Sequence, residues 1–507
     1  MPSWHLSIAS GVREFGLATP DTVAVVDGDL ELTYGAVYSR ARRLAQDLLG
    51  HGLRPGDRVG ILLGNRAEYF EIAAGVALAG LVMVPLNPRS TAAEVELIIR
   101  HSNARALLLD DTLGDQAATV LAEMAVVRAI GGTTSGPGYE AALAAARDDD
   151  PRITVDEHSP FCIAYTSGTT GKPRGVMLSH RSRALTFYAS ALEWGLGVGR
   201  RSLAVAPLYH GGGFAFGYSA VHTGGTVVVQ RKWDPEAMLH AVARYGIQSA
   251  FMVPTHAQHL RDNSEHLLRT TDLSSLDTLY FNAAALPVPL KHWVLDSFPG
   301  VGIHELYGST EAGVVSDLRP ADAARRAGSV GKPWFMTEVR LVDADGNPVA
   351  RGEAGELYSR SPYVMNGYLD DEAGTRECLT EDGFVSAGDV AIMDDEGFIS
   401  IVDRKKDMIV SGGVNIYPRE IEEILLGHAG VAEVAIAGVP DEQWGESVAA
   451  WLVAKPNATL DPAVIETYLR DRIAGYKVPK SWHVLDRLPR NGSGKVLKRE
   501  LRTMITP

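Results

Sequence analysis

A glycine-rich and hydroxyl-rich stretch with two cations carries the clearest chemistry in this sequence. It reads YTSGTTGKPRGV from Tyr165 to Val176. Its glycines let the backbone approach a ligand closely, its serine and threonines offer hydroxyl donors, and Lys172 and Arg174 bring positive charge. Apolar residues flank it on both sides, which disfavours the alternative of a polar surface turn. We therefore predict a phosphate-binding loop that wraps a triphosphate.

The spacing of this loop is not that of G-x-x-x-x-G-K-[ST], because Gly168 lies only three positions before Gly171 and a proline follows Lys172. The stretch closely resembles instead the phosphate-loop signature of the adenylate-forming superfamily of acyl-CoA synthetases, adenylation domains and luciferases. Further motifs of that family follow in the same order, so the resemblance covers nearly the whole chain. It implies ATP as the nucleotide, a metal contact at Thr166, and loop contacts to ATP at Thr166, Ser167, Gly168, Thr169, Thr170, Gly171 and Lys172.

A second motif, LYGSTEAG, places an aromatic ring, two hydroxyls and a carboxylate around a glycine. Taken alone, it fits a helix N-cap as well as a ligand site, because Ser309 or Thr310 would serve as the cap. The resemblance implies that the motif holds the adenine and phosphate side of ATP and that Glu311 reaches the Mg²⁺ that offsets triphosphate charge. The ATP contacts implied in this part of the chain are Ala283, Ala284, Tyr307, Gly308, Ser309 and Thr310.

A third motif, FVSAGDVAIMDDEGFISIVDRKKD, puts Asp389 and Arg404 on either side of a β-turn-β pattern. In the family that the motif resembles, the aspartate accepts both ribose hydroxyls and the arginine steadies ribose and phosphate. A carboxylate suits this task because it offers two acceptor oxygens. Ala387 stands where a threonine is commoner, and a plain turn is the alternative for Asp389.

Two lysines of the C-terminal part complete the implied chemistry. Lys495, in LPRNGSGKVLKREL, matches the family's adenylation lysine, which bonds the substrate carboxylate and the α-phosphate. A solvated surface lysine is the alternative. Lys406 stands two residues after Arg404, where the β-rich texture ends, and we predict that it is a hinge. The predicted catalytic set is Lys495, His210, Glu311 and Lys406.

The segment PLYHGGGFAFG has three interpretations. His210 is a core histidine, or the glycines form an esterase oxyanion hole, or the segment is the gate of an acyl pocket. The esterase elbow is missing, because no serine has glycine at both i−2 and i+2. We prefer the gate, and Gly211 and Gly212 stand where aryl-specific relatives carry larger residues, which predicts a roomier pocket. The predicted acyl-pocket residues are Phe187, His210, Gly211, Gly212, Met252, Asn282, Gly308, Gly313 and Val314.

Asn282 departs from the small residue that the family usually has before the adenine-side loop. A buried amide without a hydrogen bond costs about 1 to 3 kcal/mol, so the side chain needs a partner. A keto, hydroxyl or ring-oxygen substituent of the acid would serve, and a bond to the local backbone would serve equally well.

The acceptor side is predicted from the C-terminal segments VSGG, VPDEQWGESV and AGYKVPK. By resemblance, the indole stacks on the CoA adenine, a lysine meets the 3′-phosphate and glycines flank the pantetheine tunnel. Each has an alternative, since the tryptophan also suits a core and the glycines a turn. The predicted CoA-binding residues are Gly412, Gly413, Trp444, Tyr476 and Lys480.

Composition limits the class of protein. The chain has 507 residues, of which 46% are hydrophobic and 22% charged, and this predicts a soluble protein with two or more domains. Its formal net charge of −14, without a long basic run, argues against nucleic acid or an anionic membrane surface as a main partner. Cys162 and Cys378 are too few and too far apart for a disulfide framework, so we expect buried free thiols. We see no signal peptide and no apolar run of the ~20 residues that span a bilayer, and we expect a cytoplasmic protein, monomeric or homodimeric.

The order of elements predicts an α/β fold. Apolar strand-like runs alternate with helical patterns from Thr33 to about Leu318, in two blocks, which predicts two doubly wound αβαβα-type layers. From Gly328 onward, Gly-rich and turn-separated strands predict a small β-barrel-like region.

The chain after about Arg404 is predicted to form its own α+β unit, with one helix near Pro418 and another from Pro462 to Ala474. We therefore predict a large N-terminal domain, residues 1–403, that binds ATP and the acid. A small C-terminal lid domain, residues 404–507, would carry the catalytic lysine.

These expectations combine into one function. The resemblance implies an ATP- and Mg²⁺-dependent ligase that turns a carboxylic acid into an acyl-adenylate and passes the acyl group to CoA. An amide-forming ligase would pass the same intermediate to an amine, and a carrier-protein loader would pass it to a tethered pantetheine. A luciferase-like oxygenase and a non-enzymatic nucleotide sensor are the remaining alternatives.

Overall fold

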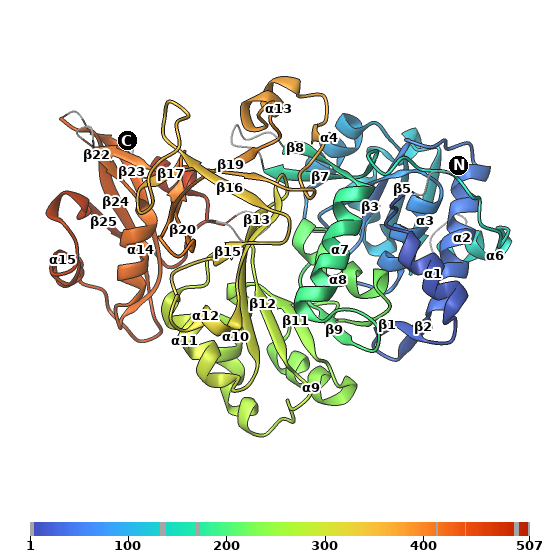
Figure 1. Ribbon diagram of the computed structural model, residues 1–507, viewed down its shortest axis with the longest axis horizontal. Coiled ribbons are helices and arrows are strands. Elements are labelled where there is room, and N and C mark those ends of the chain that lie inside the picture. The colour runs from blue at the N-terminus through green and yellow to red at the C-terminus, as the bar shows by residue number, and fades with distance from the viewer. Residues whose placement is uncertain are drawn as a thin grey trace.

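The computed structural model describes residues 5–131, 138–167, 173–411, 414–441, 443–490 and 496–504 (Figure 1). It contains two large sheets, a smaller antiparallel sheet and a C-terminal sheet. Figure 1 shows the C-terminal lobe, coloured orange to red, at one end of the molecule and the N-terminal helices, coloured blue, at the other.

The first large sheet has seven strands in the order β18-β8-β7-β4-β3-β5-β6. Neighbours from β7 to β6 are parallel, whereas β8 and β18 are antiparallel to the strands beside them. Its strands are β3 (Arg58–Leu62), β4 (Val82–Leu86), β5 (Ala104–Asp110), β6 (Val126–Ile130), β7 (Pro160–Ser167), β8 (Pro173–Ser179) and β18 (Gly367–Tyr368). The helices of this part are α2 (Tyr34–Gly50), α3 (Glu68–Leu78), α4 (Ala92–Ser102), α5 (Gly114–Ala117) and α6 (Tyr139–Ala145).

The second large sheet has nine strands in the order β15-β14-β13-β12-β11-β9-β10-β1-β2, parallel from β13 to β1. Its strands are β1 (Val23–Asp27), β2 (Leu30–Thr33), β9 (Arg201–Ala204), β10 (Thr226–Val229), β11 (Ser249–Met252), β12 (Thr278–Phe281), β13 (Gly302–Ser309), β14 (Gly313–Leu318) and β15 (Lys332–Pro333). Its helices are α1 (Ser10–Ala18), α7 (His180–Trp194), α8 (Gly211–His222), α9 (Pro235–Tyr245), α10 (Pro254–Ser264), α11 (Val288–Ser297) and α12 (Pro320–Ala323).

Helices α7 and α8 lie between the two large sheets (Figure 1). One apolar cluster contains side chains from both sheets and from these two helices. On the other face of the second sheet, α9, α10 and α11 bury a separate apolar cluster. Helices on both faces of mostly parallel sheets confirm the predicted doubly wound α/β class.

Local sequence signals explain several of these boundaries. Helix α4 begins with a capping box, in which Thr91 accepts from the Glu94 amide and Glu94 accepts from the Thr91 amide. Helix α9 has Asp234 as its N-cap, Pro235 in its first turn and Gly246 in the left-handed conformation after its end. These are the residues whose backbone preferences begin and end a helix, so local sequence signals mark both ends of α9.

The small β-rich region is a four-stranded antiparallel sheet in the order β16-β17-β19-β20. It contains β16 (Glu338–Val342), β17 (Ala354–Arg360), β19 (Val385–Met393) and β20 (Ile399–Arg404), with α13 (Glu372–Cys378) before β19.

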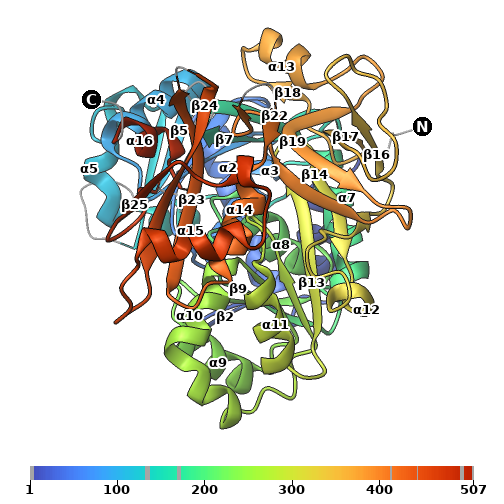
Figure 2. The same cartoon turned by 90° about the vertical axis from the view of Figure 1, so that its left-hand side faces the viewer.

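The C-terminal lobe is built on a sheet in the order β22-β21-β24-β23, with β25 parallel to β24 (Figure 2). Two apolar clusters, one with α14 and α15 and one with α16, give this lobe its own cores. Its elements are β21 (Ile409–Ser411), β22 (Val414–Ile416), α14 (Pro418–Leu426), β23 (Val431–Asp441), β24 (Gly445–Ala454), α15 (Pro462–Arg470), β25 (Ser481–Val484) and α16 (Lys498–Thr503).

The predicted end of α15 at Ala474 is wrong, because the helix ends at Arg470. The Arg472 amide donates to the Leu469 carbonyl, three residues back, so the chain tightens there. Ala474 is extended and precedes a short 3₁₀ turn, Gly475–Lys477.

Both cysteines are free thiols, as predicted. Cys162 is buried, whereas Cys378 is only partly buried. None of the helices in the described part of the chain combines the length and the apolarity needed to cross a membrane.

Candidate active site

Several predicted site residues lie outside the described residues. They belong to the phosphate loop, the pantetheine glycines and the catalytic lysine: Gly168, Thr169, Thr170, Gly171, Lys172, Gly412, Gly413 and Lys495. The loop's flanks are described, since β7 ends at Ser167 and β8 begins at Pro173, with Thr166 opposite Arg174 in the antiparallel pair.

Three predicted ATP contacts converge at the end of β13. Asp389 and Arg404 are direct partners across β19 and β20, and their side chains form an ion pair at 3.0 Å. Tyr307 donates its hydroxyl to the other Asp389 carboxylate oxygen at 2.6 Å. Burial beside this carboxylate raises the pKa of Tyr307 well above its usual value, so the phenol stays a donor. Asp389 itself is only 5% exposed, so its orientation is set before any ligand binds.

Glu311 is held by a residue that the sequence analysis missed. The Tyr368 hydroxyl donates to one Glu311 carboxylate oxygen at 3.0 Å, and the Glu311 carbonyl accepts from the Met365 amide at 2.8 Å. The Arg174 guanidinium lies 5.0 Å from the centre of the Tyr368 ring. Tyr368 comes from the short strand β18, and only its position after a glycine marks it in the sequence. The site therefore joins the flank of the phosphate loop to the LYGSTEAG motif.

The donor set at Glu311 fits a hard cation such as Mg²⁺. Its second carboxylate oxygen accepts no hydrogen bond from any described residue, so this oxygen is available to a metal. A different trio, Glu193, His304 and Asp317, has potential ligand atoms within 4.8 Å of one another, but Glu193 is occupied by Arg319 at 2.7 Å.

The LYGSTEAG motif is a strand-turn-strand between β13 and β14, so its helix N-cap alternative is wrong. Ser309 instead accepts from the Ala312 amide at 3.0 Å within the turn. A Cβ on Gly308 would lie 2.1 Å from the Gly313 carbonyl oxygen, and Gly313 has φ +71°. Both glycines are therefore required by the turn itself.

The adenine-side loop after β12 contains a strained residue. Ala283 has φ +73°, which is unusual for a residue with a Cβ, and its amide donates to the Asn282 Oδ1 at 2.6 Å. The oxygen of Asn282 thus makes the local backbone bond. Its Nδ2 donates to no atom of the described residues and remains available to a ligand. Ala283 and Ala284 are exposed.

Glu305 fixes the far end of this loop, and the sequence analysis missed it as well. Its carboxylate accepts from the Leu286 amide at 3.1 Å and forms a buried ion pair with Lys291 of α11. Only the spacing of a lysine in a helix and a glutamate in the next strand marks this pair in the sequence.

The predicted acyl gate begins helix α8, and it lies beside the nucleotide motif. His210 is the N-cap residue, with Gly211 and Gly212 in the first turn. A Cβ on Gly211 would lie 3.8 Å from the Thr310 hydroxyl oxygen, so the two motifs are neighbours. A Cβ on Gly212 would lie 3.4 Å from the Phe251 ring.

The other predicted pocket residues are more deeply buried. Phe187 is 0% exposed, and its ring centre lies 6.2 Å from that of Phe214. Met252 is 1% exposed and belongs to the apolar cluster under α9 to α11. Val314 is 5% exposed.

The predicted hinge is an exposed turn between β20 and β21. Lys406 is exposed, and its neighbour Lys405 donates its amide to the Gly388 carbonyl at 2.8 Å. On the other side, the Asp403 carboxylate accepts from the Arg419 amide at the start of α14 at 3.0 Å.

Two of the predicted CoA residues meet on the C-terminal lobe. The Lys480 ammonium lies 5.1 Å from the centre of the Trp444 ring and 3.6 Å from Asp441. Trp444 is 43% exposed and Tyr476 is 56% exposed. Among the described residues no hydrogen bond, ion pair or ring contact joins Tyr476 to Trp444 or Lys480. A large exposed indole beside a lysine is a suitable platform for a purine with a nearby phosphate.

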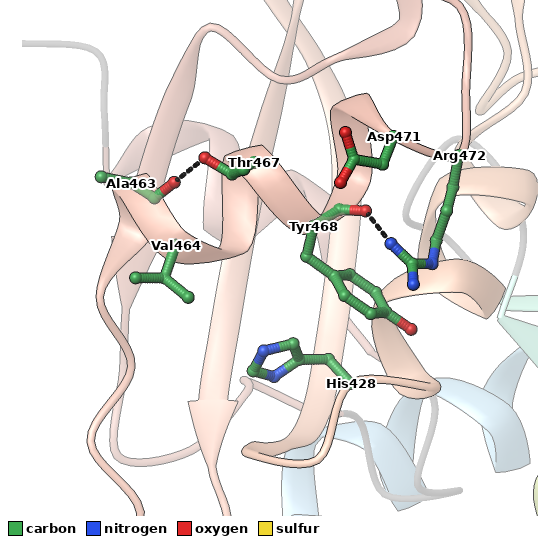
Figure 3. A pocket seen from close by; sticks show the side chains of 7 residues that line it. All are labelled: His428, Ala463, Val464, Thr467, Tyr468, Asp471 and Arg472. Atoms are coloured by element: carbon green, nitrogen blue, oxygen red, sulfur yellow. Dashed lines mark hydrogen bonds between the residues drawn. The ribbon is translucent and has the colours of Figure 1, made fainter.

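A surface cavity of about 570 Å³ lies on the same lobe, between α15 and the loop after α14 (Figure 3). The His428 ring packs edge-on against Tyr468 at 4.9 Å, and Arg472 lies 3.8 Å from the centre of the Tyr468 ring. None of the predicted site residues lines this cavity.

Comparison with known proteins gives consistent matches. The AMP-binding enzyme family matches residues 12–369, and the C-terminal domain of AMP-binding enzymes matches residues 420–495. A feruloyl-CoA synthase of an Amycolatopsis species is 40% identical over 494 residues, covering 96% of each chain. The 2-succinylbenzoate–CoA ligase of Bacillus licheniformis is 33% identical over 489 residues, covering 95% of this chain and 97% of that one. The structure of the amide bond synthetase McbA from Marinactinospora thermotolerans superposes with a TM-score of 0.89 at 28% identity, covering 99% of this chain and 100% of that one.

Proposed function

This chain belongs to the AMP-binding enzyme family and is an ATP-dependent acyl-CoA ligase, and from that premise we propose the roles of its residues and the class of its acid. The observation that carries the proposal is the convergence of Tyr307, Asp389 and Arg404. These residues lie 82 and 15 positions apart in sequence (389 − 307 and 404 − 389), yet one buried carboxylate binds both partners.

The first half-reaction forms an acyl-adenylate. A carboxylate oxygen of the acid attacks the α-phosphorus of ATP, and the bond to pyrophosphate breaks. Asp389 accepts the ribose hydroxyls, Arg404 orients ribose and phosphate, and the phosphate-loop hydroxyls with Lys172 hold the leaving pyrophosphate. Lys495 donates to the α-phosphate and the carboxylate as charge develops between them. Mg²⁺, when bound, offsets the triphosphate charge, and the Glu311 oxygen and Thr166 are the ligands that we assign to it.

In the second half-reaction the CoA thiolate attacks the acyl carbon, and AMP leaves with the electron pair of the broken carbon–oxygen bond. We assign Trp444 to the CoA adenine and Lys480 to its 3′-phosphate. Without CoA, Lys480 pairs with the Asp441 carboxylate, and the 3′-phosphate of CoA would take the place of that carboxylate. Tyr476, Gly412 and Gly413 remain predicted contacts of the same acceptor.

The two half-reactions require different positions of the lid. We place the boundary between the N-terminal domain and the lid at residues 403 and 404, with Lys406 as the hinge. Lys406 lies in an exposed turn between two sheets with separate cores. Rotation there would withdraw Lys495 from the acyl group. It would also turn the lobe surface that carries Trp444 so that the thiol of bound CoA can reach the acyl carbon.

We infer that the acid carries a ring with an oxygen substituent. The free Nδ2 of Asn282 supports this, because it is a donor that no described residue satisfies. Two relatives support it by name, since feruloyl and 2-succinylbenzoate groups are both rings bearing oxygen.

A second candidate acceptor is an amine. It is favoured by the likeness to the amide bond synthetase McbA over nearly the whole chain. An amine would need no adenine platform, so the exposed pair of Trp444 and Lys480 favours CoA. We also propose a cytoplasmic enzyme, acting as a monomer or a homodimer.

A pyrophosphate-exchange screen over aromatic, alicyclic and fatty acids tests the acid. Products formed with CoA, and separately with amines, are then identified by mass. We expect exchange with oxygen-bearing ring acids and a thioester with CoA. No thioester from any acid that supports exchange would overturn CoA in favour of the amine.

A further inference from the structure

Arg183, in the first turn of α7, is a buried cation with almost no partner in the part of the chain that the structure describes. It is 5% exposed, and its one hydrogen bond to the described residues goes to the Thr310 carbonyl oxygen at a long 3.4 Å. No carboxylate of the described residues forms an ion pair with it. A guanidinium has five N–H donors, so most of its capacity is unused.

Such an arrangement is costly unless a ligand completes it. A buried charge without a partner is among the least favourable groups in a protein interior. Burial lowers the pKa of Arg183 to about 10, so the group still carries its proton at neutral pH. The charge therefore persists and attracts an acceptor.

Thr310 connects Arg183 with the acyl gate. Phe187 follows Arg183 by one helical turn and packs against Phe214 of α8. Arg183 of α7 and Gly211 of α8 both lie close to Thr310. Thr310 links them, because its carbonyl meets Arg183 and its hydroxyl lies 3.8 Å from a Cβ position on Gly211.

The surroundings of Gly211 offer room and a favourable field for an electron-rich group. Among the described residues outside its own helix backbone, no atom would lie nearer than that hydroxyl to a Cβ on Gly211, so the glycine leaves space. The amino end of the 12-residue helix α8 lies here, and the helix dipole adds to the positive potential.

We propose that Arg183 determines acid specificity by donating hydrogen bonds to an acceptor oxygen that the acid carries remote from its reacting carboxylate. This rests on the proposed acyl-adenylate function and deepens it. A remote oxygen fits better than the reacting carboxylate, since an arginine bound to the nucleophilic oxygens would stabilise the ground state and hinder attack. The oxygen is a hydroxyl, a keto group or a second carboxylate.

The test uses three acids of one shape: cinnamic, 4-hydroxycinnamic and 4-carboxycinnamic acid. Adenylation is followed as pyrophosphate release by the parent, by Arg183→Met and by Arg183→Lys. Arg181→Met is the matched control, since Arg181 lies on the same helix and pairs with Glu157 at the surface. Binding of ATP is measured separately by calorimetry.

For the parent we expect kcat/KM to favour an oxygen-bearing acid over cinnamic acid by roughly 10- to 100-fold. Arg183→Met should bring this ratio close to one while activity on cinnamic acid and ATP binding persist. Arg183→Lys should restore part of the preference for the carboxylated acid, because it keeps the charge. Arg181→Met should leave every ratio unchanged.

Two results would contradict the role of Arg183 without contradicting the proposed function. One is an unchanged ratio in Arg183→Met, and the other is an equal loss on all three acids with weaker ATP binding, which would mean that Arg183 only supports the Thr310 turn. If Arg183→Met fails to fold, Arg183→Lys decides, since identical ratios to the parent on the hydroxylated acid would contradict a role for the planar fork. Failure of the parent to adenylate any acid of the screen would instead contradict the proposed function.

Discussion

The proposed nucleotide side of the site and the proposed acceptor side are built differently. Asp389 is 5% exposed and binds Tyr307 and Arg404 at 2.6 and 3.0 Å. Trp444 and Tyr476 are 43% and 56% exposed, and Lys480 meets the indole through a looser contact at 5.1 Å. The Asp389 cluster is preorganised on strands, whereas the residues around Trp444 lie exposed on the surface of a separate lobe.

This difference separates the two half-reactions in physical terms. Charge develops at the α-phosphate, and fixed groups in a buried setting stabilise it most effectively. In the proposed reaction CoA enters after pyrophosphate leaves, so we expect its contacts on a part of the protein that moves. Variants of the two regions should therefore affect different half-reactions, and to different extents.

The largest effect is expected from Lys495→Ala. It removes the donor that acts only as charge develops, and should cost about 2 to 4 kcal/mol of transition-state stabilisation in adenylate formation. Supplied with synthetic acyl-adenylate, the variant should still form thioester. A variant equally impaired in that transfer would contradict the assignment.

The next effect is expected from Asp389→Asn. The change leaves Arg404 without its anionic partner and weakens the ribose contact. It should lower kcat/KM for ATP roughly 30-fold, which corresponds to about 2 kcal/mol of transition-state stabilisation. Asp395→Asn, in an exposed turn between β19 and β20, is the control. Equal kcat/KM values for the two variants would remove Asp389 from the ATP site.

Lys406→Pro should prevent the lid movement that connects the two half-reactions. Proline fixes φ, so pyrophosphate exchange should largely persist while thioester formation falls by roughly tenfold or more. Lys406→Ala, which keeps backbone freedom, should behave like the parent. Parallel loss of both activities in a variant that melts like the parent would argue against a hinge.

On the acceptor side, Trp444→Ala and Lys480→Ala should each raise KM for CoA by roughly fivefold to tenfold. The indole is partly solvated, so its stacking is worth about 1 kcal/mol or slightly more. Pyrophosphate exchange should not change, and Val464→Ala, on an exposed part of the same lobe, should change neither value. Unchanged KM in both site variants would show that CoA binds elsewhere.

The smallest effect on overall rate is expected from Gly212→Val. The added side chain would press on Phe251, only 3.4 Å from the Cβ position, and narrow the pocket. The rank order of accepted acids should change a few-fold in favour of smaller ones, with ATP binding intact. A uniform loss across the acid panel would mean that Gly212 does not line the pocket.

Much of the fold was predictable because local signals agree with packing. Asp234, Pro235 and Gly246 mark both ends of α9, and alternating apolar runs mark the strands of both large sheets. The end of α15 was not predictable from periodicity, since the apolar pattern continues to Ile473 while the backbone tightens after Leu469. Helix ends depend on hydrogen bonds that hydrophobic spacing does not encode.

The sequence by itself determined the α/β class, the free thiols and the motif residues of an adenylate-forming ligase, because these depend on residue type and short spacing. Only the tertiary structure decided which of them meet. Tyr368 reaches Glu311 from 57 residues away, and Arg183 reaches Thr310 from 127 residues away. Such contacts depend on how helices and sheets pack over long separations. A buried arginine therefore appears in the sequence as one more surface cation.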